Sequence, residues 1–218
     1  MSEKLDLLDF LPVKTGTSIE YRKGELVCTQ GSSQDPRIFM VQSGILLLET
    51  RVGLGIVHHG EVFGVEVMCG LYTVSARCLE PSKVMYWDVE DLLGGLGIRQ
   101  EFNIALMQWL VDQNTSLQRK VERLHTMRTK DRLKAFLVDM AARYGGVPGE
   151  DGMISIPYFG HREIASLIGT TREAVTHLMG QLREEGLISF KMRSPICVSP
   201  ALMEGRGELS RAAEAAAD

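Results

Sequence analysis

The segment over residues 99–127 most constrains the fold, because it is a long helical pattern with a seven-residue apolar repeat. One seam position of the repeat holds Met107, Asn114 and Val121, and the other holds Leu110, Leu117 and Leu124. This spacing is typical of a helix that lies along a second copy of itself. A polar Asn at this seam position favours a parallel, in-register pair, since only then do the two Asn114 amides meet. The sequence therefore predicts a parallel homodimer, and the alternative is an ordinary core helix with one apolar face.

The chain before this helix is predicted to be β-structure. From residue 19 to residue 89, short β-branched and apolar pieces alternate with glycine turn signals, which is typical of a small antiparallel roll or barrel. The clearest predicted hairpin pairs residues 37–41 with residues 45–50 across a turn at residues 42–44. A short helix is expected over residues 88–93, leading into the long one.

Composition limits the class of protein. At 218 residues the chain is long enough for two modest domains, and its 44% hydrophobic content is ordinary. No apolar run reaches the length of a membrane span, and the first ten residues lack the basic start and apolar core of a signal peptide. We therefore expect a cytoplasmic protein with no membrane partner.

The cysteines show no metal-binding pattern. Cys28, Cys69, Cys78 and Cys197 lack CxxC spacing, which argues against a zinc site and against a disulfide framework. We expect four buried, reduced thiols, no bound metal and no catalytic residue.

The net charge of −4 conceals an asymmetry. Residues 1–118 hold 9 Lys and Arg against 15 Asp and Glu, whereas residues 119–218 hold 15 against 13. A basic segment over residues 116–134 contains Arg119, Lys120, Arg123, Arg128, Lys130, Arg132 and Lys134. Such a segment is usually a solvated helical face, but beside a DNA-reading motif it can be part of a phosphate-positioning surface.

The carboxy-terminal half carries the most specific motif. A helix is predicted over residues 133–144 and ended by Gly145 and Gly146, and residues 154–156 alternate as a short strand. A further helix over residues 161–168, a sharp turn at Gly169 and a second helix capped by Thr171 have the spacing of a helix-turn-helix. The residues expected to face inward are Ile164, Ala165, Ile168, Val175, Leu178 and Leu182. Residues 187–190 and 196–199 add a hairpin wing around residues 191–195.

This motif predicts how DNA is read. A second helix lying in the major groove reads bases through its first turn and its outer face. Arg172 can donate two hydrogen bonds to guanine O6 and N7, and Glu173 can accept one from cytosine N4. The predicted DNA-binding residues are Arg172, Glu173, Thr176, His177, Thr171 and Lys191. Two alternatives stay open, a helical hairpin that binds no DNA and a salt bridge that occupies Glu173.

The order of these motifs resembles one protein family. KGELVCTQG, IFMVQSGILLLE, GEVFGVE and VSARCLEP, followed by the long helix, are similar to the sensor half of the cAMP receptor protein and fumarate-nitrate regulator (CRP/FNR) superfamily of bacterial transcription factors. The likeness covers about residues 8–199. GELVCTQG and SLQRKVERLHTMRTKDRLKAF are most similar to the carbon-monoxide-sensing haem regulators of the CooA type. In the family's reading helix an Arg often stands where this chain has His177, which puts the usual half-site in doubt because neutral imidazole is a poorer guanine reader.

The resemblance implies an effector pocket but also shows departures. Cyclic-nucleotide-binding members hold the ribose with a Glu, and Glu66 stands at that place. They hold the cyclic phosphate with an Arg, and Val74 stands there, so the anion lacks its bidentate partner. Those members also carry a Thr-Ser pair on the long helix, and this chain has Leu117 and Gln118 at that place. We expect an effector other than cAMP, in a pocket formed by Gly64, Glu66, Ser75, Ala76, Leu117 and Gln118.

A haem sensor with non-standard ligands is the first alternative. The Cys-x-His motif of the CooA type falls on residues 64–66, so other ligands would be needed. Residues of the right type are Cys69, Cys78, His58, His59 and His125. His58 and His59 are neighbours on a predicted strand and are expected to face opposite ways. An iron–sulfur cluster is disfavoured because no cysteine cluster precedes Cys28.

The sequence as a whole predicts an α+β protein in four parts. These are an antiparallel β-roll that senses an effector (1–98), a dimerisation helix (99–127), a winged helix-turn-helix domain that binds DNA (128–200) and a tail (201–218). The expected partners are double-stranded DNA, a second copy of the chain, an unidentified small-molecule effector and, from the resemblance, RNA polymerase. The alternatives from other classes are a cupin-like metal-dependent enzyme, which needs three facial ligands, and a ligand-binding dimer that never touches DNA.

Overall fold

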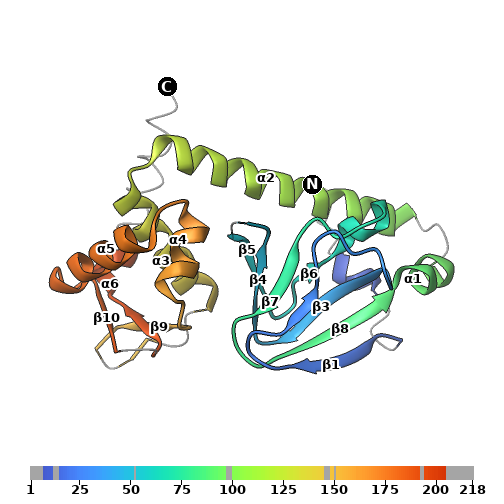
Figure 1. Cartoon of the computed structure of the whole chain (residues 1–218), viewed down its shortest axis with the longest axis horizontal. Coiled ribbons are helices and arrows are strands. Elements are labelled where there is room, and N and C mark those ends of the chain that lie inside the picture. Colours follow the sequence, from blue (N-terminus) through green and yellow to red (C-terminus); the bar gives the residue numbers. More distant parts are fainter. Residues whose placement is uncertain are drawn as a thin grey trace. The chain divides into compact units, whose positions relative to one another are not determined.

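The computed structural model describes residues 7–11, 15–51, 53–96, 100–144, 148–149, 151–191 and 194–204. The chain divides into two compact units, Met1–Ser116 and Leu117–Asp218, and each is described by itself. The predicted long helix is present as α2 (Gln100–Thr126), and the boundary between the units falls within it (Figure 1). Among the described residues, no helix is both long and apolar enough to cross a bilayer.

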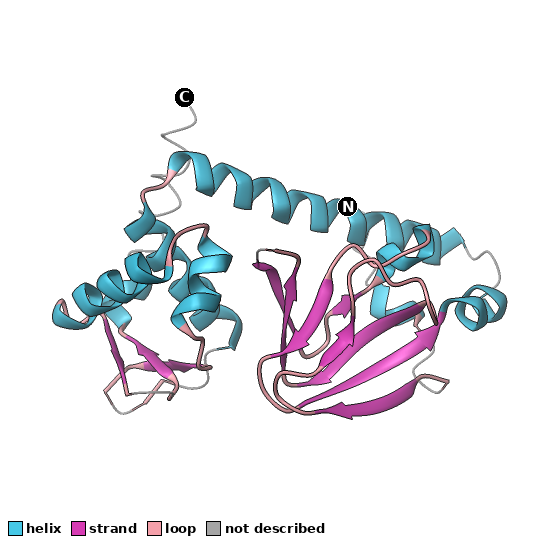
Figure 2. Cartoon of the chain, viewed as in Figure 1, coloured by secondary structure: helices cyan, strands magenta, loops and turns pink. Residues whose placement is uncertain are grey.

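The first unit is built on two antiparallel four-stranded sheets, as expected for a β-roll (Figure 2). One sheet has the order β1–β8–β3–β6, with β1 (Thr17–Tyr21), β8 (Ser82–Asp88), β3 (Arg37–Ser43) and β6 (Val62–Phe63). The other has the order β2–β7–β4–β5, with β2 (Leu26–Cys28), β7 (Ser75–Cys78), β4 (Ile45–Glu49) and β5 (Gly53–His58). The short helices are η1 (Leu7–Phe10), η2 (Val65–Cys69) and α1 (Val89–Leu96). The last of these confirms the short helix predicted before α2.

The predicted hairpin between residues 37–41 and 45–50 is wrong. Both strands form, but β3 pairs with β8 and β6, whereas β4 pairs with β5 and β7. The turn at Gly44 therefore carries the chain from one sheet to the other. Gly44 has φ 91°, and a Cβ atom there would lie 2.3 Å from Ser82 Oγ. Glycine is required at this corner both for its backbone conformation and for the close approach of β8.

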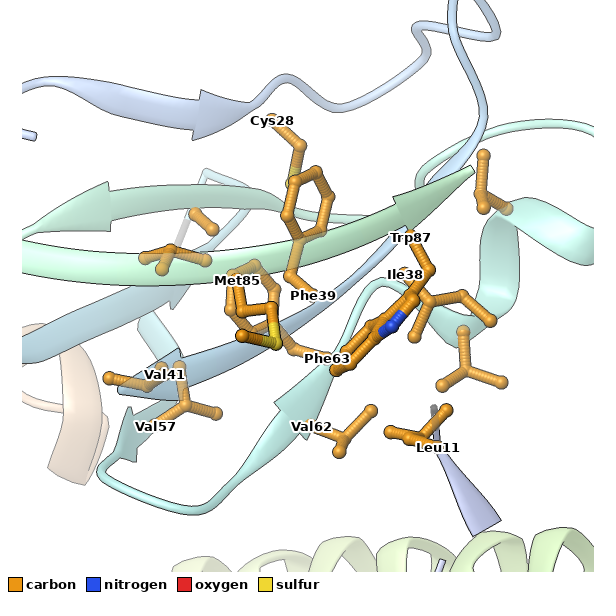
Figure 3. Close-up of a cluster of buried hydrophobic side chains, with 14 of the residues drawn as sticks. Leu11, Cys28, Ile38, Phe39, Val41, Val57, Val62, Phe63, Met85 and Trp87 are labelled. Carbon is orange, nitrogen blue, oxygen red and sulfur yellow. The ribbon is translucent and has the colours of Figure 1, made fainter. Parts of the chain in front are cut away.

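One apolar core joins the two sheets to α2. Phe39 stacks on Phe63 with ring centroids 5.0 Å apart, and Ile38 lies opposite Trp87 in the register of β3 and β8 (Figure 3). Phe102 and Ala105 of α2 are buried in the same cluster. The first part of α2 therefore packs on the roll through one face, which fixes the direction in which its other faces point.

The second unit contains the helices and the small sheet predicted for the carboxy-terminal half. Its elements are α3 (Thr129–Tyr144), β9 (Ile154–Ile156), α4 (His161–Ile168), α5 (Arg172–Glu184), β10 (Ile188–Phe190), β11 (Ile196–Val198) and α6 (Pro200–Glu204). The sheet order is β10–β11–β9, and both pairs are antiparallel. The predicted stop at Gly145 and Gly146 and most of the predicted tail lie outside the described residues, whereas α6 falls at the start of that tail.

Both helices of the helix-turn-helix, α4 and α5, pack into the core of this unit. Phe136 of α3 meets Phe159 edge-on at 5.6 Å, and Ile164 and Ala165 of α4 are buried. On α5 the buried residues are Val175, Met179 and Leu182. The expectation that Leu178 faces inward is wrong, because Leu178 is only half-buried and Met179 takes the core position.

Candidate functional site

The turn between α4 and α5 has the geometry that the motif requires. Gly169 ends α4 with φ 66°, a conformation that a residue with a side chain rarely adopts. Thr171 then caps α5, and its Oγ1 accepts a hydrogen bond from the Ala174 amide at 3.2 Å. This capping bond satisfies one of the free amides at the start of the helix. The first turn of α5 is thereby fixed where base reading would take place.

The outer face of α5 presents the predicted reading residues. Arg172, Glu173, Thr176 and His177 are all exposed, and their spacing puts them on one side of the helix. The Thr176 hydroxyl donates to the Arg172 carbonyl at 2.9 Å, and His177 Nε2 lies 3.0 Å from Gln181 Nε2. The long side chains of Arg172 and Glu173 therefore extend from the first turn into solvent, in the position that contacts bases in helix-turn-helix proteins.

His161 supports this face from α4. Its Nδ1 lies 2.8 Å from Thr176 Oγ1, and since that hydroxyl hydrogen is already donated to a carbonyl, Nδ1 carries the hydrogen. Burial lowers the pKa of His161, and the nearby Arg172 guanidinium lowers it further. Sequence reasoning missed this residue, because its partner lies fifteen positions along the chain.

The wing forms as predicted. Phe190 pairs with Ile196 in the register of β10 and β11, and the His161 ring meets the Phe190 ring edge-on at 6.3 Å. At the wing tip Lys191 is exposed, and its backbone amide donates to Ser194 Oγ at 3.0 Å. The wing is thus packed against α4, with a cation at its tip.

The basic segment over residues 116–134 is not a uniform phosphate-binding face, because several of its cations are engaged within the unit. Arg123 Nη1 lies 2.6 Å from Asp139 Oδ2 of α3. Lys130 pairs with Glu185 at the end of α5. Arg132 Nε donates to the Ile168 carbonyl. These partners lie far along the chain, which is why the charge count alone overstated the free positive charge.

The predicted seam of α2 is exposed in the single chain. The exposed fractions are 62% for Met107, 50% for Leu110, 51% for Leu117, 54% for Val121 and 39% for Leu124, and Asn114 is exposed as well. Ile104 and Val111 widen the same apolar stripe. Phe102 and Ala105, which pack on the roll, lie on the opposite side of the heptad. A stripe of this kind on a long helix is characteristic of a helix that pairs.

The predicted effector residues fall in both units. Gly64, Glu66, Ser75 and Ala76 belong to the first unit, where Gly64 and Ala76 are buried. Leu117 and Gln118 are exposed on the part of α2 that belongs to the second unit. Glu66 Oε1 is buried and has no hydrogen-bond partner among the described residues. An unsatisfied buried carboxylate oxygen is costly in a protein interior and therefore suggests a site for a hydrogen-bond donor.

Two expectations about the Cys and His residues were wrong: the four thiols are not all buried, and His58 and His59 are not neighbours on one strand. Only Cys28 and Cys78 are buried, while Cys69 is exposed and Cys197 is half-buried. His58 ends β5 but His59 lies in the turn that follows, where its Nδ1 is 2.7 Å from the Gln42 carbonyl. Within the described ranges, no group of three or more His, Cys, Asp and Glu is arranged to hold a metal ion.

The buried thiol of Cys28 is unreactive at neutral pH. Burial raises its pKa to about 12, and the nearby Glu66 carboxylate adds to the increase. Its Sγ lies 3.9 Å from the Val74 carbonyl. A thiol with so high a pKa stays protonated and is a poor nucleophile.

Comparison with known proteins agrees with this architecture. The family model for the Crp-like helix-turn-helix domain matches residues 131–201, and the family model for the cyclic nucleotide-binding domain matches residues 18–96. The transcriptional regulator SdrP of Thermus thermophilus is 34% identical over 184 residues, which are 78% of this chain and 84% of that protein. The chain thus has the two domains of a transcription regulator, one of the cyclic nucleotide-binding type and one that binds DNA.

Solved structures show the same fold. FixK2 from Bradyrhizobium japonicum has a TM-score of 0.73 at 20% identity, over 90% of this chain and 96% of that one. A transcriptional regulator of the CRP/FNR family from Thermus thermophilus has a TM-score of 0.71 at 23% identity, over 89% of this chain and 98% of that one. The protein belongs to the CRP/FNR family of transcription regulators, which confirms the resemblance, the α+β class and the regulatory function expected from the sequence.

Proposed function

We propose that the protein works as a parallel homodimer that binds a pseudo-palindromic DNA site and is controlled by an effector other than cAMP. The observation that carries this proposal is the exposed pair Arg172 and Glu173 on the capped first turn of α5. We propose a cytoplasmic location, RNA polymerase as a further partner, and no enzymatic activity of its own.

The apolar stripe of α2 supports the homodimer. Its seam residues are about half exposed in one chain, and Phe102 and Ala105, on the opposite side of the first part of the helix, are already packed on the roll. A second copy with the same stripe buries both sets of side chains at once. Asn114, at the centre of the stripe, favours the parallel register. A parallel pair presents two reading helices, which suit half-sites about one helical turn apart.

Glu66 supports an effector site within the roll. Its buried Oε1 is a hydrogen-bond acceptor without a donor among the described residues. Burial raises the pKa values of the Cys28 thiol and the Tyr72 hydroxyl, and the nearby Glu66 charge raises both further. We propose that the effector donates a hydrogen bond to Glu66, and that Gly64, Ser75 and Ala76 of the same unit line its site. An effector that binds one packing of the helix pair better than the other shifts the population toward that packing.

The DNA-binding part of the proposal is tested by selecting duplexes from a random library with the purified full-length protein. We expect an inverted repeat whose half-sites are centred about 10 base pairs apart, occupied by two chains. Selected duplexes without two-fold symmetry, or occupied by one chain, would contradict the proposal.

We expect no tight binding of cAMP, because Val74 provides no cation for the cyclic phosphate. Calorimetric titration of the native protein should show no submicromolar dissociation constant. Val74→Arg places a guanidinium at that position and should raise the affinity for cAMP by roughly tenfold or more, the value of one charge-assisted hydrogen bond. Submicromolar binding of cAMP by the native protein would contradict this part of the proposal.

A further inference from the structure

Arg132, in the first turn of α3, binds backbone carbonyls from two other parts of the second unit. Its Nε donates to the Ile168 carbonyl at 2.8 Å, and its Nη2 donates to the Gly169 carbonyl at 3.2 Å. Its Nη1 donates to the Met127 carbonyl at 2.7 Å. One side chain therefore links the helix-turn-helix turn to the residue that follows α2.

The chemistry of these acceptors calls for an arginine. The carbonyls lie at or just after the carboxyl ends of α4 and α2, where helices leave their last carbonyls unsatisfied and carry partial negative charge. A planar guanidinium donates in several fixed directions at once, whereas a lysine ammonium is a single point of charge. Satisfying three separated carbonyls with one side chain therefore depends on the shape of arginine as well as on its charge.

An apolar contact joins the same two segments. A Cβ atom placed on Gly169 would lie 2.5 Å from Leu124 Cδ2, so the end of α2 packs directly on the turn. Leu124 is thus a predicted seam residue that also contacts the turn before α5. The segment connecting Gly169 to Arg172 is two residues long and includes the Thr171 cap. A shift of the turn is transmitted to the first turn of α5, because the connection is too short to absorb it.

We infer that Arg132 is a positioning residue for DNA reading, which holds the turn before α5 against the end of α2 so that the reading helix moves together with the end of the long helix. The inference rests on the proposed function, because it assigns Arg132 a role in presenting Arg172 to bases. Arg132 itself binds protein carbonyls. Its effect on DNA is therefore indirect and falls on sequence discrimination.

The test compares Arg132→Lys with Arg128→Lys in the full-length protein. Arg128 is exposed in the segment between α2 and α3, so its replacement is the matched control. Each protein is titrated with a duplex selected by the native protein and with an unrelated duplex of equal length. For Arg132→Lys we expect at least a tenfold loss of affinity for the selected duplex and less than a twofold change on the unrelated one. For Arg128→Lys we expect the ratio of the two affinities to stay at its native value.

A second measurement needs no variant and so does not depend on how well Arg132→Lys folds. Hydrogen exchange of the arginine Nε–H groups is followed by NMR in the native protein. The Arg132 group should exchange at least tenfold more slowly than the Arg128 group, because it donates to the Ile168 carbonyl.

The outcomes separate this inference from the proposed function. The positioning role is overturned if the Nε–H groups of Arg132 and Arg128 exchange at equal rates. It is also overturned if Arg132→Lys leaves the ratio of the two affinities unchanged, whether neither duplex loses affinity or both lose it equally. If the native protein selects no duplex at all, the proposed function fails first. The exchange measurement would then still report whether Arg132 holds the turn.

Discussion

Replacing Val121 by Asp is expected to convert the protein to a monomer and to abolish high-affinity DNA binding. Val121 is 54% exposed in the single chain and lies at the seam position that faces its own copy in a parallel pair. Two opposed carboxylates in a desolvated seam cost several kcal/mol, since neither has a partner. The loss of one half-site should lower the affinity for a selected duplex by roughly 100-fold or more. Sedimentation equilibrium gives the mass, and a binding titration gives the affinity.

The control for this variant is Ser116→Asp. Ser116 is exposed on α2 but lies on the side of the heptad away from the seam, so the same added charge should leave mass and affinity unchanged. A dimeric Val121→Asp protein, or a monomer that binds the selected duplex as tightly as the native protein, would show that the stripe serves another purpose.

Replacing Arg172 by Ala is expected to weaken binding of the selected duplex by about 1–3 kcal/mol for each guanine that is no longer read and to relax the preference at one base position of each half-site. The reason is that Arg172 is exposed on the first turn of α5, where we expect its guanidinium to donate to guanine O6 and N7. Titration of duplexes changed at single positions measures both effects.

Lys191→Ala is the comparison for Arg172→Ala. Lys191 is exposed at the wing tip, and we expect it to contact phosphate, which carries no sequence information. Its removal should weaken selected and random duplexes alike and make binding less sensitive to salt. An equal loss on selected and random DNA for Arg172→Ala would refute the assignment of Arg172 as a base-reading residue.

The elements governed by local signals were predicted well. The helix-turn-helix was found at the right residues because a left-handed glycine, a capping threonine and helical apolar spacing are all encoded within a few positions. The turn at Gly44 was misread for the opposite reason. A buried strand, a glycine and a second buried strand describe a hairpin and a corner between two sheets equally well. The close approach of Ser82, which decides between them, comes from a distant strand.

In the candidate site, too, the features set by local sequence could be predicted and those set by distant contacts could not. The exposed positions of α5 follow from helical periodicity, and the structure places Arg172 and Glu173 as expected from it. The role of Arg132 could not be predicted, because two of its acceptors lie on a turn more than thirty residues further along the chain. Charge in the sequence indicates which side chains need partners, but the fold decides whether those partners are phosphates or carbonyls of the chain itself.

The direction of the paired helices is tested most directly by cross-linking through position 107. Met107→Cys is made together with Cys69→Ser and Cys197→Ser, which removes the accessible native thiols and leaves the buried Cys28 and Cys78. In a parallel, in-register pair the two copies of residue 107 face each other, and mild oxidation should join them in a disulfide-linked dimer. An antiparallel pair centred on Asn114 instead brings residue 107 against residue 121. Failure of Met107→Cys to link to itself, together with linkage to Val121→Cys in a mixed sample, would contradict the parallel dimer.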